Sequence, residues 1–183
     1  MRAMSFGDER DMVLSSMLDR LEFAEEQALP FEKKIKERAK ESEDVRLLMS
    51  IPGVNFYLGS LVSSYIGDVK RFPDGDHQAS YLGIVPAEKR SSSINRVGRM
   101  SKDGPDIARM ALSIMVDTVS KCDKQVHGYY AKAKDRVGGK MAHVLTMKKL
   151  VRMIHAMLTK REKWRWEKKT LTAMKIEMLE KTD

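Results

Sequence analysis

The chain has 183 residues, 42% of them hydrophobic and 33% charged, with a net charge of +8. This length suits one domain of ordinary size with an appendage, and the hydrophobic content allows a buried core. The single cysteine, Cys122, excludes a disulfide framework and multi-cysteine metal sites. No apolar run is long enough to span a bilayer, so we expect no membrane contact and a cytoplasmic protein.

The positive charge is concentrated in one part of the chain. Residues 132–170 hold 13 basic and 3 acidic residues, a net charge of +10. A patch of this density is typical of a polyanion-binding surface, and a solvated helical face is the alternative.

The first segment, residues 1–42, is predicted to be a helical, coiled-coil-like arm. Its apolar residues alternate in steps of three and four, at Leu14, Met17, Leu21, Ala24 and Ala28. We expect Pro30 to stop or kink this helix, with a second helical stretch over 31–40. An arm this short needs a packing partner, which predicts a homo-oligomer formed through it.

Residues 45–66 are predicted to form two apolar helices joined by a tight turn at Pro52 and Gly53. This is the pattern of the helix-hairpin-helix, a binder of the DNA backbone through N–H groups at a helix N-terminus. Asn55 stands where the usual motif has a second glycine, and a purely structural turn is the alternative.

Residues 67–106 are rich in turn formers. We expect a short helix over 76–82, with Asp74 as a possible cap, and a small β-hairpin or a loop over 84–100. Five basic residues of this stretch are candidate nucleic-acid contacts: Lys89, Arg90, Arg96, Arg99 and Lys102. Three serines, Ser91, Ser92 and Ser93, lie among them, and solvated turn residues are the ordinary interpretation of such a cluster.

Three further helices are predicted, over 106–120, 141–164 and 165–179. The first is expected to present Ile107, Met110 and Ile114 with Ala111 and Met115 on one apolar face. The second carries the candidate contacts Lys148 and Arg152. Trp164 and Trp166 lie among basic residues, where they could stack on unpaired bases or anchor the arm. The fold class is therefore all-α: an arm (1–42), a helical domain (43–164) and a C-terminal helix (165–183).

The order of these motifs resembles the C-terminal part of the IS110 family of insertion-sequence transposases. The resemblance is carried by Leu48–Val54, Ile66–Asp68, Arg71–Pro73, Tyr81–Pro86, Arg96–Gly104 and Lys148–Leu158. It covers about residues 43–164, and residues 8–42 resemble the family's coiled-coil linker. No single motif is decisive, but their shared order over about 120 residues is specific.

The resemblance implies a function in DNA transposition. Such transposases have an N-terminal RuvC-like domain whose four acidic residues bind magnesium, and a serine in the C-terminal domain acts as a nucleophile on DNA. Members are directed by a structured guide RNA. Counting back from Gly98 places Ser91 at the nucleophile's position, with Ser92 where the family has glycine, so Ser92 and Ser93 remain alternatives. Arg90, Arg96 and Arg99 could stabilise phosphoryl charge there.

This sequence has no counterpart of the RuvC-like domain, so we expect no cofactor in this chain, with magnesium only in that domain. Ser91 would act only within a composite active site, and the chain alone would not transpose. The expected partners are DNA, a guide RNA and a second copy of the chain, in the nucleoid of a bacterium or archaeon. The alternative function is a non-catalytic helical module that binds DNA or RNA.

Overall fold

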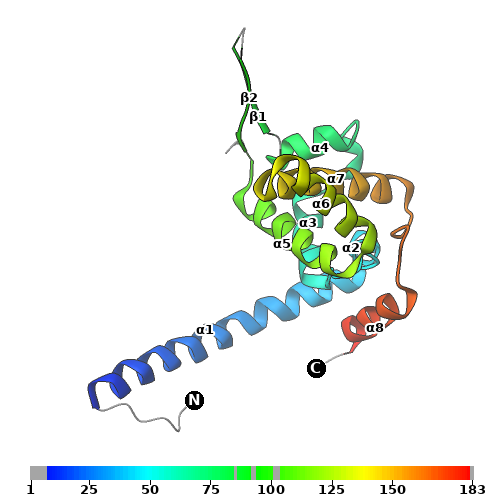
Figure 1. The fold of residues 1–183 in the computed structure, drawn as a ribbon. Helices are drawn as coiled ribbons and strands as arrows, with labels where there is room; N and C mark the ends of the chain where they lie inside the picture. The colour runs from blue at the N-terminus through cyan, green and yellow to red at the C-terminus, as the bar shows by residue number, and fades with distance from the viewer. Residues whose placement is uncertain (1–7, 85, 92–93, 101–103, 182–183) are drawn as a thin grey trace. The chain divides into compact units, whose positions relative to one another are not determined.

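The computed structural model describes residues 8–84, 86–91, 94–100 and 104–181. The chain divides into two compact units, residues 1–38 and 39–183. Helices dominate both units, and the two strands form a single antiparallel hairpin (Figure 1). The expectation of an all-α fold is confirmed, and of the two alternatives for residues 84–100, a hairpin or a loop, the structure has the hairpin. Within the described ranges, no helix is both long and apolar enough to cross a membrane.

The first unit consists of helix α1 (Asp8–Glu41), whose last turn extends into the second unit. Pro30 lies inside this helix, so the expectation that it stops the helix before a second stretch over 31–40 is wrong, and the alternative of a kink stays a prediction. Proline removes one N–H donor, and the carbonyl that this leaves without a partner can be solvated because residues 21–34 are exposed. Good helix formers on both sides of Pro30 favour continuation.

The second unit begins with α2 (Glu43–Met49) and α3 (Phe56–Ile66), followed by a short 3-10 helix, η1 (Val69–Arg71), and α4 (Gly75–Tyr81). Strands β1 (Pro86–Ser91) and β2 (Ile94–Met100) follow. The chain then forms α5 (Asp106–Cys122), α6 (Lys124–Val137), α7 (Gly139–Lys160) and α8 (Lys169–Glu180).

Helix α7 is the centre of the second unit, because it contacts α2, α4, α5, α6 and η1. Its residues Leu150 and Ile154 are fully buried, as are Leu112 and Met115 of α5. The predicted apolar face of α5 is partly wrong, since Ile107, Met110 and Ile114 are exposed. The buried side of α5 is lined by Ala108, Ala111, Leu112, Met115, Val116 and Val119.

Helices α6 and α8 differ from the sequence expectation. Helix α6 was not predicted, because its apolar pattern is weak and only Val126 and Ala133 are buried. The preceding helix α7 ends at Lys160, where Arg161 adopts a left-handed conformation (φ 58°), a common helix terminator. The final helix begins at Lys169 and not at 165. It packs Leu179 against Ala39, Val45 and Met49 in a second, smaller core.

Candidate nucleic-acid interface

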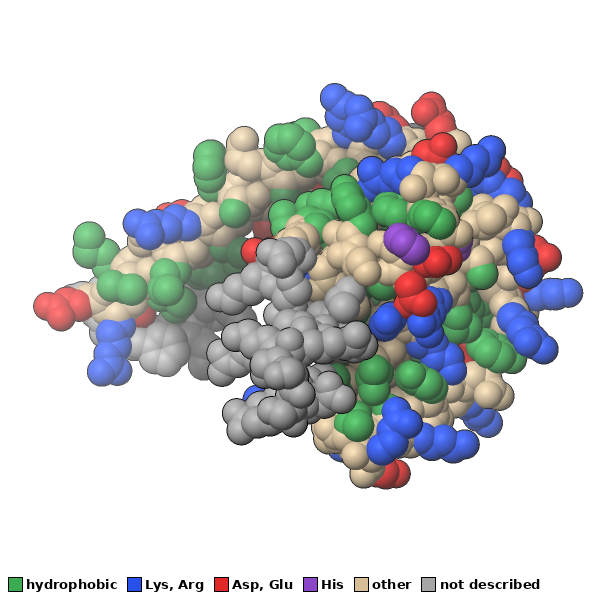
Figure 2. All heavy atoms as spheres, turned by 90° about the horizontal axis from the view of Figure 1, so that it is seen from above, with side chains coloured by type: hydrophobic (Ala, Val, Ile, Leu, Met, Phe, Trp, Pro, Cys, Tyr) green, Lys and Arg blue, Asp and Glu red, His purple; other side chains and the backbone are tan. Residues whose placement is uncertain are grey.

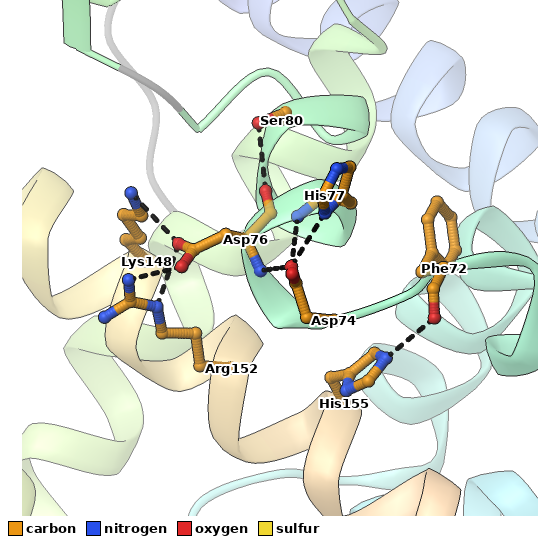
Figure 3. Close-up of polar contacts among 8 residues, drawn as sticks. All are labelled: Phe72, Asp74, Asp76, His77, Ser80, Lys148, Arg152 and His155. Carbon is orange, nitrogen blue, oxygen red and sulfur yellow. Dashed lines mark hydrogen bonds and ion pairs between the residues drawn. The ribbon is translucent and has the colours of Figure 1, made fainter.

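The N-terminus of α4 carries a cluster of polar side chains (Figure 3). Asp74 is the N-cap, as predicted, and its Oδ1 accepts hydrogen bonds from the backbone N–H groups of Asp76 and His77 at 2.8 and 2.9 Å. The His77 ring lies 2.9 Å from the same oxygen. These hydrogen bonds, chiefly those from His77, lower the pKa of Asp74. Asp74 therefore stabilises the first turn of α4, on which the other polar side chains of the cluster lie.

Two candidate contacts, Lys148 and Arg152, meet at this cluster. They lie one turn apart on α7, and both bind Asp76 (Figure 3). Arg152 donates to Oδ2 of Asp76 at 2.5 Å and to Oδ1 at 2.9 Å, and the Lys148 ammonium lies 3.0 Å from Oδ1. Hydrogen bonds from Arg152 and then Lys148 lower the pKa of Asp76 to about 2. Asp76 therefore stays ionised, and the three side chains together carry one net positive charge.

Close backbone packing holds this ion pair in place. A Cβ on Gly75 would lie 2.7 Å from the Cα of Arg152, so only glycine allows α4 to approach α7 this closely. His155, one turn after Val151 on α7, donates from Nε2 to the carbonyl oxygen of Phe72 at 3.2 Å. Lys148 and Arg152 are thus part of the α4–α7 contact, and a phosphate would have to share them with Asp76.

The predicted turn at Pro52 and Gly53 joins α2 to α3, with Asn55 as the N-cap of α3. Asn55 Oδ1 accepts from the N–H of Leu58 at 2.9 Å and the residue is exposed. Pro52 is buried. Gly53 (φ 87°) leaves little room for a side chain, because its Cβ would lie 3.0 Å from the backbone of Thr118 on α5. The turn therefore packs against α5. Its use as a DNA-binding helix-hairpin-helix stays a prediction.

Lys175 of α8 binds this same turn. Its ammonium group donates to the carbonyl oxygens of Met49, Ile51 and Val54, the latter two at 3.0 and 2.9 Å. Burial lowers the pKa of Lys175 to about 8. Sequence reasoning missed this residue, because a lysine of a mixed-polarity helix has no pattern that indicates a partner more than a hundred residues away.

The hairpin contains most of the remaining candidate residues. Ser91 ends β1 and pairs with Ile94, the first residue of β2. Arg90 pairs with Asn95, and Lys89 pairs with Arg96. Arg99 lies near the end of β2. The candidates Ser92, Ser93 and Lys102 lie outside the described residues. Along this ladder Arg90 lies one position, and Arg96 two positions, from the pair that Ser91 forms with Ile94.

The two tryptophans, Trp164 and Trp166, differ in burial. Trp164 is only 2% exposed, and its indole Nε1 donates to Oδ2 of Asp123 at 2.9 Å. Its backbone N–H donates to Ser50 Oγ at 2.8 Å. Trp166 packs edge-on against it and is 38% exposed. Trp164 is therefore a core anchor that is closed to base stacking.

Exposed basic side chains are abundant on the described surface. Helices α6 and α7, residues 124–160, hold nine basic residues and one acidic residue, Asp135. Among the exposed ones are Lys132 and Lys140, and Lys149 lies 3.9 Å from the centre of the Tyr129 ring. In Figure 2, Lys and Arg side chains gather along the right-hand edge, with a few acidic groups between them. Across the described ranges, no three His, Cys, Asp or Glu side chains come together in a way that could hold a metal ion.

Comparison with known proteins identifies relatives of this helical unit. Residues 45–131 match the model of the transposase IS116/IS110/IS902 family. The chain is 28% identical over 141 residues to the transposase for insertion sequence element IS1111A of Coxiella burnetii, covering 74% of this chain and 38% of that protein. It is 26% identical over 110 residues to a probable family 20 transposase of Pseudomonas aeruginosa, covering 60% of this chain and 32% of that protein.

Proposed function

Because residues 45–131 form a domain of the transposase IS116/IS110/IS902 family, we propose that this chain binds DNA as part of a transposase. The family match carries the proposal. The excess of basic residues on α6 and α7 supports it, since each phosphate that a lysine or arginine neutralises releases counterions from the DNA. The matched part of this chain spans 38% and 32% of the lengths of the two relatives. That the chain takes part in the activity of a whole transposase is therefore also a proposal.

The salt dependence of binding tests this proposal. The purified chain is titrated against labelled duplex, a four-way junction and a structured RNA at several salt concentrations. Replacing exposed Lys132 and Lys140 with glutamine should reduce the slope of log affinity against log salt by about 2, since each phosphate contact contributes about 0.9. The matched control replaces Lys33 and Lys34 with glutamine. These are exposed lysines of the net acidic arm, and their replacement should change the slope less. Equal effects of the two pairs, or no binding near physiological salt, would contradict the proposal.

The structured RNA in the same titration tests the second predicted partner. A guide RNA is proposed from the family resemblance, and the same basic helices offer it the charge complement that they offer DNA. Preference for the junction or the RNA over plain duplex supports the transposase assignment, whereas equal affinity for all three indicates a non-specific polyanion binder.

The catalytic part of the proposal concerns Ser91. Its hydroxyl oxygen would attack a DNA phosphorus, forming a Ser–O–P bond and releasing a strand with a free hydroxyl that takes up the proton. The register supports this role, because Arg90 precedes Ser91 in β1 and the Lys89–Arg96 pair lies two positions further along the ladder. The test is a denaturation-resistant DNA adduct in a reconstituted full-length transposase. Loss of the adduct in Ser91→Ala but not in Ser113→Ala supports the role, and retention in Ser91→Ala refutes it.

Self-association through the arm is the remaining proposed interaction. On α1 the residues Met17 and Leu21 are 63% and 54% exposed, one turn apart on the same side of the helix. A lone helix gains little stability in water, and pairing two such stripes buries them. Replacing both residues with glutamine should shift the chain from dimer to monomer in sedimentation, whereas the same change at exposed Met174 and Met178 of α8 should not. A wild-type monomer at all concentrations contradicts the proposal.

A further inference from the structure

An aromatic residue and an arginine form a stacked pair at the end of α4. Tyr81 is the last residue of that helix, and Arg71 is the last residue of η1. The guanidinium carbon of Arg71 lies 4.3 Å from the centre of the Tyr81 ring and 4.6 Å from the centre of the Phe72 ring. The two rings are 5.4 Å apart and tilted by 52°. These distances are typical of cation–π contacts.

The pair is held in place and yet accessible. Arg71 also donates from Nη2 to the carbonyl oxygen of Tyr65 at 3.0 Å, so its long side chain has three separate contacts. Phe72 is buried, and its own carbonyl oxygen is bound by His155. Tyr81 nevertheless remains 46% exposed. A ligand that stacks here would therefore not have to order a mobile side chain first.

The surroundings favour a nucleic-acid strand as the ligand. Lys70, next to Arg71, is exposed and adds a second positive charge. His77 lies four residues before Tyr81 on α4, so both rings face the same side of the helix, and His77 is exposed. Aromatic rings beside cations bind single strands by base stacking, because every base has a π-face and a nearby phosphate. Of the two tryptophans, Trp164 is buried and cannot play this part.

We propose that the Arg71–Tyr81 pair is a stacking site for an unpaired base of a DNA strand. This inference rests on the proposed function, because it assumes that the chain binds DNA. It adds a preference that charge alone does not give, since stacking needs a base that is free of its pairing partner. The site would therefore strengthen binding to single strands and leave the affinity for plain duplex unchanged.

The test measures binding of the full chain to a fluorescein-labelled thymidine strand of about 12 nucleotides and to a duplex of the same length. Tyr81→Leu, which keeps an apolar side chain but removes the ring, should weaken single-strand binding about ten-fold and leave duplex binding unchanged. Tyr81→Phe should bind like the wild type. The matched control is Tyr57→Leu, because Tyr57 is 47% exposed on α3 and should not affect binding.

A second measurement reports stacking directly in the wild-type chain. A 2-aminopurine base in the strand should lose fluorescence when the wild-type chain binds, and keep it with Tyr81→Leu. Equal single-strand affinities for Tyr81→Leu and Tyr57→Leu, or a loss that instead follows Trp166→Leu, overturn the inference. Stronger Tyr81-dependent binding to a uridine RNA strand overturns the assignment to DNA. Duplex binding without any single-strand effect overturns the stacking site alone, whereas a wild-type chain that binds neither probe overturns the proposed function as well.

Discussion

The hydrogen bond between Trp164 and Asp123 should be a major contributor to the stability of the second unit. Asp123 is 5% exposed, and it caps α6 by accepting from the N–H groups of Gln125 and Val126 at 2.8 and 3.1 Å. Asp123→Ala loses this cap, which costs about 1 kcal/mol. It also leaves the buried indole N–H without its acceptor, which costs about 1–3 kcal/mol. We therefore expect a loss of about 2–4 kcal/mol in the free energy of unfolding.

A double-mutant cycle separates the hydrogen bond from the cap. Urea unfolding followed by circular dichroism is measured for Asp123→Ala, Trp164→Phe and the double variant. Trp164→Phe removes the indole donor, so the two changes should be coupled by about 1–3 kcal/mol. Asp135→Ala, at an exposed position of α6, is the control and should change stability by less than about 0.5 kcal/mol. Additive effects of the two substitutions would refute the reasoning, because they would show that the buried pair does not interact.

Three other changes test local features of the second unit. Gly53→Ala should destabilise by about 1–3 kcal/mol in urea unfolding, because of its positive φ and its approach to the Thr118 backbone; an unchanged midpoint would contradict the packing. Asp76→Asn should lower the melting temperature at pH 6. The difference from the wild type should vanish as the pH falls from about 4 to 2, because the contacts of Asp76 with Arg152 and Lys148 stabilise the folded state only while Asp76 is ionised. A difference that persists below pH 2 would reject this ion pair. Lys175→Met removes three charged hydrogen bonds to the turn, and even one of them is worth enough to speed hydrogen exchange in α8 by about ten-fold or more. Unchanged exchange would show that α8 does not depend on Lys175.

Much of the local structure could be predicted from short-range signals. The cap at Asp74 was predicted, because its side chain can reach N–H groups two or three residues later. Asn55 caps α3 in the same way, although that cap was not predicted from the sequence. The turn at Pro52 and Gly53 was predicted from the residue types, because proline ends a helix and glycine permits a tight turn. Two predictions from short-range sequence signals were wrong. Pro30 does not end α1, and the face of α5 that contains Ile107 is exposed. Periodicity identifies an apolar stripe, but it cannot say which of two neighbouring stripes meets another helix.

The sequence by itself determined the helical class, the resemblance to a transposase family and the concentration of positive charge between residues 132 and 170. It left open whether residues 84–100 form a hairpin or a loop. Only the tertiary structure decided what the individual candidates contact. It paired Arg152 with Asp76, 76 residues away, and Trp164 with Asp123, 41 residues away. It also placed Lys175 on the carbonyl of Val54, 121 residues away. Such pairs depend on how helices pack in three dimensions, and local propensity and periodicity carry no information about that packing.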